Sequence, residues 1–376
     1  MPGRLARLVL SAALLCLSAA PAAKAAYSLH HTYAGDSFFE GWDWYGSNDD
    51  LTGGTVYYVP QNESADLAYV NEAGNVVIKV DNTTTLGPSA YRDSVRITSQ
   101  DVYDIGSLVI FDALHTPYGP ATWPAMWLHA RAWPSGGEID VFEGVNNAET
   151  NQVALHTVAG CYSSNTSSVE NGILGSTNCD YTVAANEGCT YRDTRNESYG
   201  EAFAANGGGV WAAELASTGI SVWFFPRNQV PSDLRSSSAT PDPTTWGTPM
   251  AHYQEDSCAI NQYFAPQQIT VNIALCGSWA GQPGVFSQTG IEGDCATYAR
   301  NPAHFDNAYF ELLSISVYTD PSLNTRSGKQ IAAGAVGSIG AGSSGSSATS
   351  GASTGLKTAA AMALAGAVGA AAVALF

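Results

Sequence analysis

Three carboxylates stand close together in the segment GGEIDVFEGVN, at Glu138, Asp140 and Glu143. Charged residues make up only 13% of the chain, so three acids in one short apolar segment need an explanation. Neighbouring like charges raise one another's pKa, so one carboxyl can stay protonated while another is ionised. This division of roles suits the cleavage of a glycosidic bond, in which one acid protonates the leaving oxygen and one carboxylate attacks the anomeric carbon.

The local backbone must bring these acids to one side. A regular strand alternates its side chains, so Glu143 would point away from Glu138 and Asp140 and into the opposite layer. An uncompensated carboxylate in a core is costly, and we therefore predict a β-bulge that turns all three acids to one face. Ile139 and Val141 would then face the core. Two glutamates placed this way can reach the separation of about 5–5.5 Å that is typical of retaining glycosidases.

The residues before the acids favour a sugar site over a plain edge strand. A solvated edge strand whose charges prevent aggregation is the alternative for EIDVFE. However, Trp123, Trp127 and Trp133 precede the acids in TWPAMWLHARAWPSGG, and aromatic faces stack on the apolar face of sugar rings. Core packing is the competing explanation for these tryptophans, and we expect it to account for at least one of them.

The elements that position the acids are predicted to be strands. The chain has 38 glycines and 10% aromatic residues, and no long segment shows sustained helical periodicity. Runs rich in β-branched and aromatic residues lie between Gly, Pro, Asn and Asp clusters, at 74–80, 94–98, 106–114, 219–225, 267–275 and 309–318. We predict an all-β fold, an antiparallel β-sandwich, with one domain over about 27–319.

The charge balance narrows the choice of partners. The formal net charge is −18 and the pI is near 4.5. Such a surface repels phosphate backbones, so a nucleic-acid partner is not expected. A neutral polysaccharide would not be repelled.

Both ends resemble targeting segments. Arg4 and Arg7 precede the apolar run LVLSAALLCLSAA, and Ala23-Lys24-Ala25 offers a small-x-small cleavage site, which together predict a signal peptide. The alternative, a membrane anchor, would need a longer apolar run. At the other end, a Gly/Ser/Ala-rich stretch leads into the uncharged tail TAAAMALAGAVGAAAVALF, the layout of a GPI-attachment signal.

A spanning helix is the alternative for this tail, but such helices usually carry basic residues on the cytoplasmic side. We place the anchor residue within 345–350. The predicted division of the chain is a signal peptide at 1–25, a domain at 26–325, a linker at 326–357 and a GPI-attachment tail at 358–376.

The cysteines fit an exported protein. Six remain after the predicted cleavage, namely Cys161, Cys179, Cys189, Cys258, Cys276 and Cys295. An even number in an oxidising compartment predicts up to three disulfides, whose pairing the sequence leaves open. Metal ligation is the alternative, but no C-x-x-C pair or Cys/His cluster supports it. Glycosylation sequons occur at Asn62, Asn82, Asn165 and Asn196.

The segment WPAMWLHARAWPSGGEIDVFEGVNN resembles the signature of glycoside hydrolase family 16, and within it the fungal laminarinase-like endo-1,3(4)-β-glucanases. Four further segments match the family pattern: FFEGWDWYGSNDDLTGGTVYYV, NQVALHTVAGC, NIALCGSWAG and AHFDNAYFELLSISVY. The spacing E-x-D-x-x-E marks the bulged laminarinase type, whereas lichenases and xyloglucan-active relatives carry E-x-D-x-E. The resemblance covers about 27–319 and implies a curved, concanavalin A-like β-jelly-roll.

The resemblance also implies roles for single residues. Glu138 would be the nucleophile, Glu143 the general acid/base and Asp140 the assisting carboxylate. The family pattern further places a hydrogen-bonding histidine within the site and three tryptophans along the sugar subsites, here His156, Trp123, Trp127 and Trp279. His156 could instead be an ordinary structural histidine. This chain has Gly277-Ser278-Trp279 where the family often has Gly-Asp-Trp.

These observations together predict a monomeric, secreted and GPI-anchored retaining endo-β-glucanase. It would hydrolyse β-1,3 and mixed β-1,3/1,4 glucans by double displacement at the cell surface or wall, without a cofactor, because two carboxylates suffice. The sequence identifies no metal site, and a structural calcium stays open. One alternative is a cell-wall glucan transglycosylase with the same carboxylates. Another is a non-catalytic β-glucan-binding protein, although such proteins lose one or both glutamates.

Overall fold

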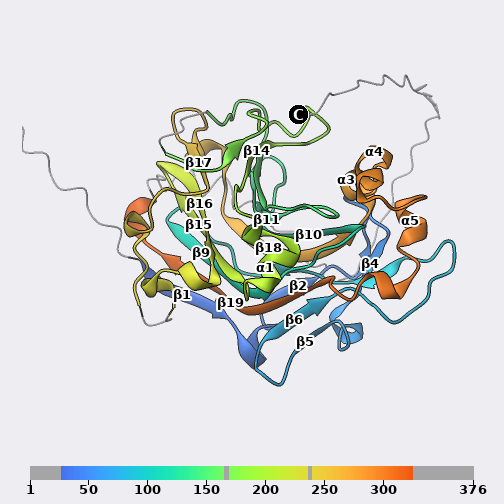
Figure 1. The fold of residues 1–376 in the computed structure, drawn as a ribbon. Coiled ribbons are helices and arrows are strands. Elements are labelled where there is room, and N and C mark those ends of the chain that lie inside the picture. The colour runs from blue at the N-terminus through green and yellow to red at the C-terminus, as the bar shows by residue number, and fades with distance from the viewer. Residues whose placement is uncertain (1–26, 165–168, 236–238, 325–376) are drawn as a thin grey trace, which may run out of the picture. The chain divides into compact units, whose positions relative to one another are not determined.

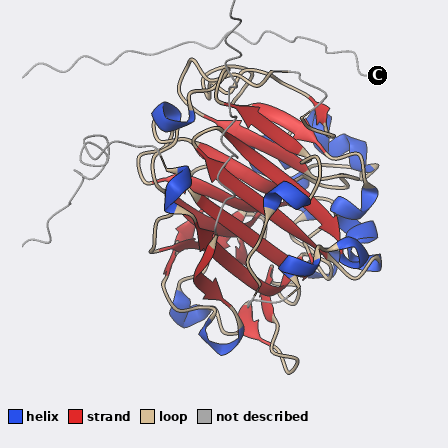
Figure 2. Cartoon of the chain, turned by 90° about the vertical axis from the view of Figure 1, so that its left-hand side faces the viewer, coloured by secondary structure: helices blue, strands red, loops and turns tan. Residues whose placement is uncertain are grey.

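The computed structural model describes residues 27–164, 169–235 and 239–324. Within these residues two large antiparallel sheets pack face to face, and a small third sheet lies beside them (Figure 1). The predicted all-β antiparallel sandwich is therefore confirmed. Figure 2 shows strands forming the body and short helices around their ends. The helices are α1 (Gly200–Ala205), α2 (Ile260–Tyr263), α3 (Gly277–Ala280), α4 (Pro283–Phe286) and α5 (Cys295–Tyr298).

The strand order in each sheet shows which segments become neighbours. The first sheet runs β17 (Ala251–Gln254), β16 (Gly219–Pro226), β15 (Gly209–Ala216), β9 (Ser107–His115), β19 (Tyr309–Thr319), β6 (Val76–Lys79) and β5 (Ala68–Val70), with β1 (Ser28–Tyr33) paired to β19. The second runs β13 (Ile173–Leu174), β14 (Cys189–Arg192), β12 (Gln152–His156), β11 (Glu138–Glu143), β10 (Thr122–Ala130), β18 (Gln267–Leu275), β8 (Arg96–Ser99) and β2 (Trp42–Trp44). The third contains β3 (Ser47–Asn48), β4 (Val56–Tyr58) and β7 (Arg92–Ser94).

The main core fills the space between the two large sheets. Alternate residues of each strand point into it, as Trp211 does on β15 and Ile139 does on β11, and both are fully buried. On the far side of the first sheet, a smaller apolar cluster includes Trp223 and Trp246. The second sheet differs, because its face away from the core carries the three acids. We call this the outer face of the second sheet.

Most of the predicted strands are present with small changes in length, and one run needs correction. The run 94–98 is divided, since β7 ends at Ser94 and β8 begins at Arg96. The two halves serve different sheets: β7 pairs in parallel with β4, whereas β8 pairs with β18 and β2. The sequence analysis also missed β15, whose segment GVWAAELA is rich in alanine and so lacks the β-branched pattern of a strand.

All six cysteines form disulfides, which confirms the predicted number and adds the pairing. The bonds join Cys161 to Cys258, Cys179 to Cys189, and Cys276 to Cys295. The predicted signal peptide, the linker and the GPI-attachment tail all lie outside the described residues. No helix in the described ranges is long and apolar enough to cross a membrane.

Candidate active site

The bulge in β11 brings the three acids to one face. Against β12, the register of β11 shifts between Asp140 and Glu143, and a matching shift occurs against β10. Val141 and Phe142 are consecutive, yet both are fully buried. The acids lie opposite alternate residues of β10, which share one face, with Glu138 paired to His129, Asp140 to Trp127 and Glu143 to Ala125. The predicted bulge is thus confirmed.

Asn151, at the start of the next strand, holds the bulge in place. Its Oδ1 accepts from the backbone N–H of Glu143 at 2.9 Å, and its Nδ2 donates to the carbonyl of Val141 at 2.9 Å. Asn151 is fully buried, and its own backbone N–H donates to Ser198 Oγ at 2.9 Å. The side chain therefore replaces ladder bonds that the extra residue disrupts. The sequence analysis missed this residue, because nothing local to Asn151 marks it as a partner of β11.

Each catalytic candidate glutamate receives one indole N–H. Trp123 Nε1 donates to Glu143 Oε1 at 2.8 Å, and Trp133 Nε1 donates to Glu138 Oε2. Trp127 Nε1 instead donates to Asn272 Oδ1 at 2.7 Å. The expectation that core packing explains at least one of these tryptophans is wrong. None belongs to the core clusters, because all three stand on or beside the outer face, and Trp133 is 44% exposed.

His156 lies beside the acids and is held at both ring nitrogens. Its Nε2 is 3.2 Å from Asp140 Oδ2, and its Nδ1 is 2.9 Å from Asn186 Oδ1. Burial lowers the pKa of the imidazole, but the hydrogen bond to Asp140 and the negative charges of Glu138, Asp140 and Glu143 outweigh it and raise the pKa to about 10. His156 is therefore cationic at neutral pH.

The acids differ in how strongly they hold a proton. Burial, followed by the charge of Asp140, raises the pKa of Glu143 to about 8. Burial and the charge of Glu138 raise the pKa of Asp140 to about 7. Burial also raises the pKa of Glu138, but the cationic His156 and the indole N–H of Trp133 favour its ionised form. Glu143 is thus suited to donate a proton at neutral pH.

Aromatic side chains extend along the outer face on both sides of the acids. The guanidinium of Arg96 lies over the rings of Tyr45 and Trp127, at 5.2 and 5.0 Å from their centroids. Trp279 of α3 meets Trp123 edge to face, with 5.6 Å between centroids. The disulfide from Cys276, which immediately precedes α3, ties this segment to α5. The structure therefore brings Trp123, Trp127 and Trp279 into one region, and adds Arg96 and Tyr45, which sequence reasoning missed.

One group of side chains has the geometry to hold a metal ion. Single ligand atoms of Glu138, Asp140 and His156 lie within 4.8 Å of one another. A cation bound there would have to displace the proton on His156 Nε2, which the surrounding carboxylates stabilise. The donor set therefore suits a shared proton better than a metal ion.

Three of the four predicted glycosylation sites lie in the described ranges. Asn62 and Asn196 are exposed. The Asn82 side chain is half-buried, with Nδ2 donating to Asp306 Oδ1 at 2.8 Å and Oδ1 accepting from Lys79 Nζ at 2.7 Å. Glycosylation of Asn82 would replace one of the two hydrogens on Nδ2, so the sugar would have to fit beside Asp306. Asn165 lies outside the described residues.

The model of an XgeA-like, catalytic GH16 domain matches residues 42–318. The chain belongs to glycoside hydrolase family 16. Among curated relatives, a probable glycosidase of Schizosaccharomyces pombe is 40% identical over 296 residues, which is 78% of this chain and 69% of that protein. Further relatives are probable endo-1,3(4)-beta-glucanases of Aspergillus species and an endo-1,3(4)-beta-glucanase of Emericella nidulans, and the chain spans about half their length or less.

Two solved structures of family 16 enzymes are similar over their full lengths. Laminarinase 16A from Phanerochaete chrysosporium, holding two β-glucans in its donor and acceptor sites, is 39% identical with a TM-score of 0.75, and 78% of this chain is covered. An elongating β-1,3-glucosyltransferase of the family is 32% identical with a TM-score of 0.70, again over 78% of this chain. The expected β-jelly-roll of family 16 is therefore confirmed.

Proposed function

We propose that this family 16 domain is a retaining endo-β-glucanase that hydrolyses β-1,3 and mixed β-1,3/1,4 glucans. The observation that carries the proposal is the bulged strand, which puts Glu138 and Glu143 on one face and gives each a separate indole donor. The names of the Aspergillus relatives and the glucans bound to laminarinase 16A support the substrate class.

The reaction follows from the ionisation of the acids. Glu143 holds its proton at neutral pH and would deliver it to the glycosidic oxygen as the bond breaks. Glu138 would attack the anomeric carbon and form a covalent glycosyl-enzyme. Glu143, now ionised, would then take a proton from the water that releases the sugar. As the glycosyl-enzyme forms, the negative charge on Glu138 is lost and one appears on Glu143. Asp140 and the cationic His156 would stabilise these changes in charge.

The tryptophans supply the surface on which sugar rings stack. Trp123 and Trp127 stand on β10 beside the acids, and Trp279 is presented by α3 across from Trp123. Ring faces of this kind bind the apolar C–H surface of glucose units. We assign Trp123 and Trp127 to subsites next to the scissile bond and Trp279 to the far side.

The test is hydrolysis of laminarin and of a mixed-linkage glucan by the chain with its disulfides intact, beside Glu138→Gln. We expect the first products to carry the β-anomer by NMR, and we expect the variant to lose at least about 10³-fold in rate. Faster cleavage of one glucan would define the linkage preference. Binding of both glucans without cleavage would overturn the proposal and favour a glucan-binding protein.

Transfer to a second sugar is the other function with support. The elongating β-1,3-glucosyltransferase shares this fold at 32% identity, and transfer uses the same two carboxylates. The covalent intermediate would then be intercepted by a sugar hydroxyl in place of water. Oligosaccharides longer than the starting laminarin oligomer would identify transfer, and a product set limited to shorter chains would identify hydrolysis.

The place of action is part of the proposal. We infer that the chain is exported through the segment 1–25 and held at the outer cell surface by a GPI anchor within 345–350, as a glycosylated monomer. Three disulfides support passage through an oxidising compartment. Release of the chain from intact cells by a phosphatidylinositol-specific phospholipase would test the anchor. Retention after complete cleavage of a control GPI protein would count against it.

A further inference from the structure

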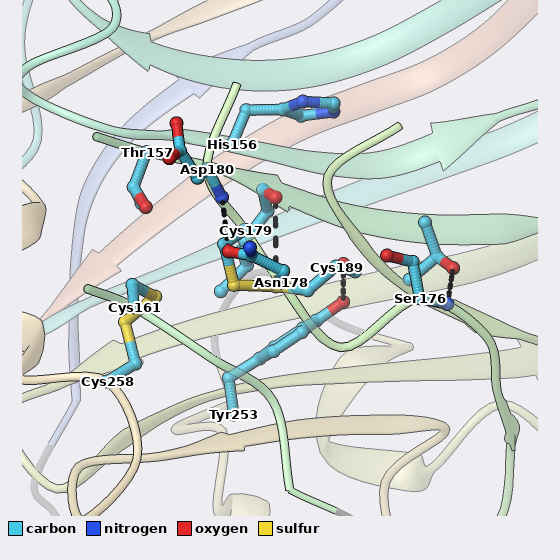
Figure 3. The surroundings of a disulfide bond; sticks show 12 residues. His156, Thr157, Cys161, Ser176, Asn178, Cys179, Asp180, Cys189, Tyr253 and Cys258 are labelled. Atoms are coloured by element: carbon cyan, nitrogen blue, oxygen red, sulfur yellow. Dashed lines mark hydrogen bonds between the residues drawn. A yellow bond between two sulfur atoms is a disulfide. The ribbon is translucent and has the colours of Figure 1, made fainter. Parts of the chain in front are cut away.

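A disulfide-closed loop lies against His156. The loop, residues 180–188, is closed by the Cys179–Cys189 bond, and its two ends flank the histidine along β12. Cys189 pairs with Leu155 on one side of His156, and the carbonyl of Cys179 accepts from Thr157 N–H at 2.7 Å on the other. Figure 3 shows this disulfide near His156, the last residue of β12, and Thr157, which follows it. The loop is therefore fastened at both chain neighbours of the histidine.

The loop backbone is shaped to approach the imidazole closely. Ala184, Ala185 and Asn186 have φ of 47°, 53° and 63°, a left-handed conformation that non-glycine residues rarely adopt in succession. Gly188 follows with φ of 71°, and a Cβ placed there would lie 2.7 Å from His156 Cε1. Any larger residue at 188 would have to displace the ring. Such an unfavourable turn persists where the surroundings fix it, as it does at functional sites.

Asn186 meets the ring nitrogen that faces away from Asp140. Its Oδ1 is 2.9 Å from His156 Nδ1, which places a hydrogen on Nδ1. A neutral histidine with its proton on Nδ1 would turn a lone pair on Nε2 toward Asp140, which lies 3.2 Å away. The contact is favourable only when Nε2 also carries a proton or when Asp140 does. The loop thus keeps a proton between His156 and Asp140.

The same loop has a second contact with the centre. Tyr181 meets Trp133 edge to face, with 5.4 Å between ring centroids, and Trp133 donates to Glu138. One loop therefore contacts two of the three side chains that favour the ionised form of Glu138, namely His156 and Trp133, the third being Arg96.

We propose that loop 180–188 positions the catalytic carboxylates and that Asn186 is a positioning residue, which holds His156 doubly protonated and oriented toward Asp140. The expected effect on kcat rests on the proposed function, whereas the expected protonation of His156 does not. The charged groups that face His156 from β11 are Glu138, Asp140 and Glu143. Within the loop, the Asp180 carboxylate accepts from Thr182, so the neutral Asn186 is the loop side chain that bonds the ring.

The test compares Asn186→Gly with Ala185→Gly. Glycine tolerates positive φ, so Asn186→Gly removes the acceptor without straining the turn. We expect the pKa of His156, followed by ¹⁵N NMR of its ring, to fall by about one unit, and kcat on laminarin to fall about tenfold with KM little changed. Ala185→Gly gives the backbone the same freedom and removes only an exposed methyl group. We expect this variant to keep the wild-type His156 pKa, kcat and KM.

Two further variants separate positioning from loop stability. Asn186→Asp keeps an acceptor of the same shape, so it should retain the doubly protonated ring and most of kcat. Gly188→Ala should shift the ring resonances and lower kcat more than Asn186→Gly does. An unchanged His156 pKa in Asn186→Gly, or equal losses in Ala185→Gly, would overturn the inference. The NMR titration needs no turnover, so a chain that fails to cleave glucan would refute the proposed function and still test the role of Asn186.

Discussion

Two clusters of buried charge stand in this molecule, and they are balanced in opposite ways. The guanidinium of Arg92 is fully buried and donates to the carbonyls of Asp81, Thr84, Ala299 and Arg300 and, at 3.4 Å, to the carboxylate of Asp81. Every side of this cation meets an oxygen. In the active centre, three crowded carboxylates surround the cationic imidazole of His156, and the guanidinium of Arg96 lies farther along the same face.

The difference shows what each cluster does. Burial raises the pKa of Asp81, but hydrogen bonds from Thr83 and Thr84 outweigh burial and lower it. Asp81 is therefore ionised at neutral pH. On the outer face the pKa values of Asp140 and Glu143 are raised to about 7 and about 8, so these two acids keep an affinity for protons near neutral pH, and the pKa of Glu138 is raised as well. At Arg92 the buried charge is balanced, and this balance stabilises the fold. In the active centre the negative charges are not balanced, and the carboxylates there stay reactive.

The largest effect should come from removing the proton donor. Glu143→Gln should lower hydrolysis of laminarin by about 10²–10⁴-fold, because general acid catalysis contributes that much. The thermal midpoint should stay equal or rise, since one of three crowded acids becomes neutral. Activity assays and thermal melts at pH 7 would measure both. A clear fall in the midpoint would mean that the carboxylates are structural, as the Arg92 cluster is.

The complementary change is Arg92→Met. It leaves Asp81 buried without its cation, and loss of one partner of a buried pair typically costs about 3–5 kcal/mol of unfolding free energy. Urea denaturation would measure this loss, and kcat per folded molecule should be unchanged because the cluster lies outside the active centre. Arg131→Met is the control, because the exposed Arg131 bonds one backbone carbonyl, and we expect a change within about 0.5 kcal/mol. Loss of kcat in Arg92→Met would break the distinction between the two clusters.

These two clusters also differ in what the sequence could predict. The acids of β11 were accessible because their spacing conflicts with strand alternation, and a bulge resolves the conflict locally. Arg92 gave no such signal, since its partners Ala299 and Arg300 are about two hundred residues away in the chain. Asn151 and Asn186 were missed for a related reason. Their roles depend on the orientation of one side chain in a turn, which residue type and period do not encode.

The fold follows the same rule. Long apolar strands such as β18 were found because their own residues carry the pattern, and the predicted run 267–275 coincides with it. The division of 94–98 between two sheets was missed because it depends on which neighbour each half pairs with. Disulfide number followed from counting, while pairing required the folded chain.

The smallest effect, and the sharpest in sign, is the pH dependence of stability. The pKa of Glu143 in the folded chain is about 8, above the ordinary 4.5, so the folded state binds more protons between these values. Stability from this group is present at low pH and is lost as the pH rises through that window. Asp81 has a lowered pKa, so its contribution is present above its ordinary pKa and is lost as the pH falls.

Thermal melts of the wild type, Glu143→Gln and Asp81→Asn between about pH 3 and pH 9 would resolve the two signs. Relative to Glu143→Gln, the midpoint of the wild type should decline from about pH 5 to pH 8, because the variant has no Glu143 proton to lose. Relative to Asp81→Asn, it should decline as the pH falls below about 4, because acid removes the Asp81 charge that Arg92 requires. If the relative midpoint declined with rising pH in both comparisons, or with falling pH in both, the two clusters would respond to pH in the same way. The contrast between structural and catalytic charge would then not hold.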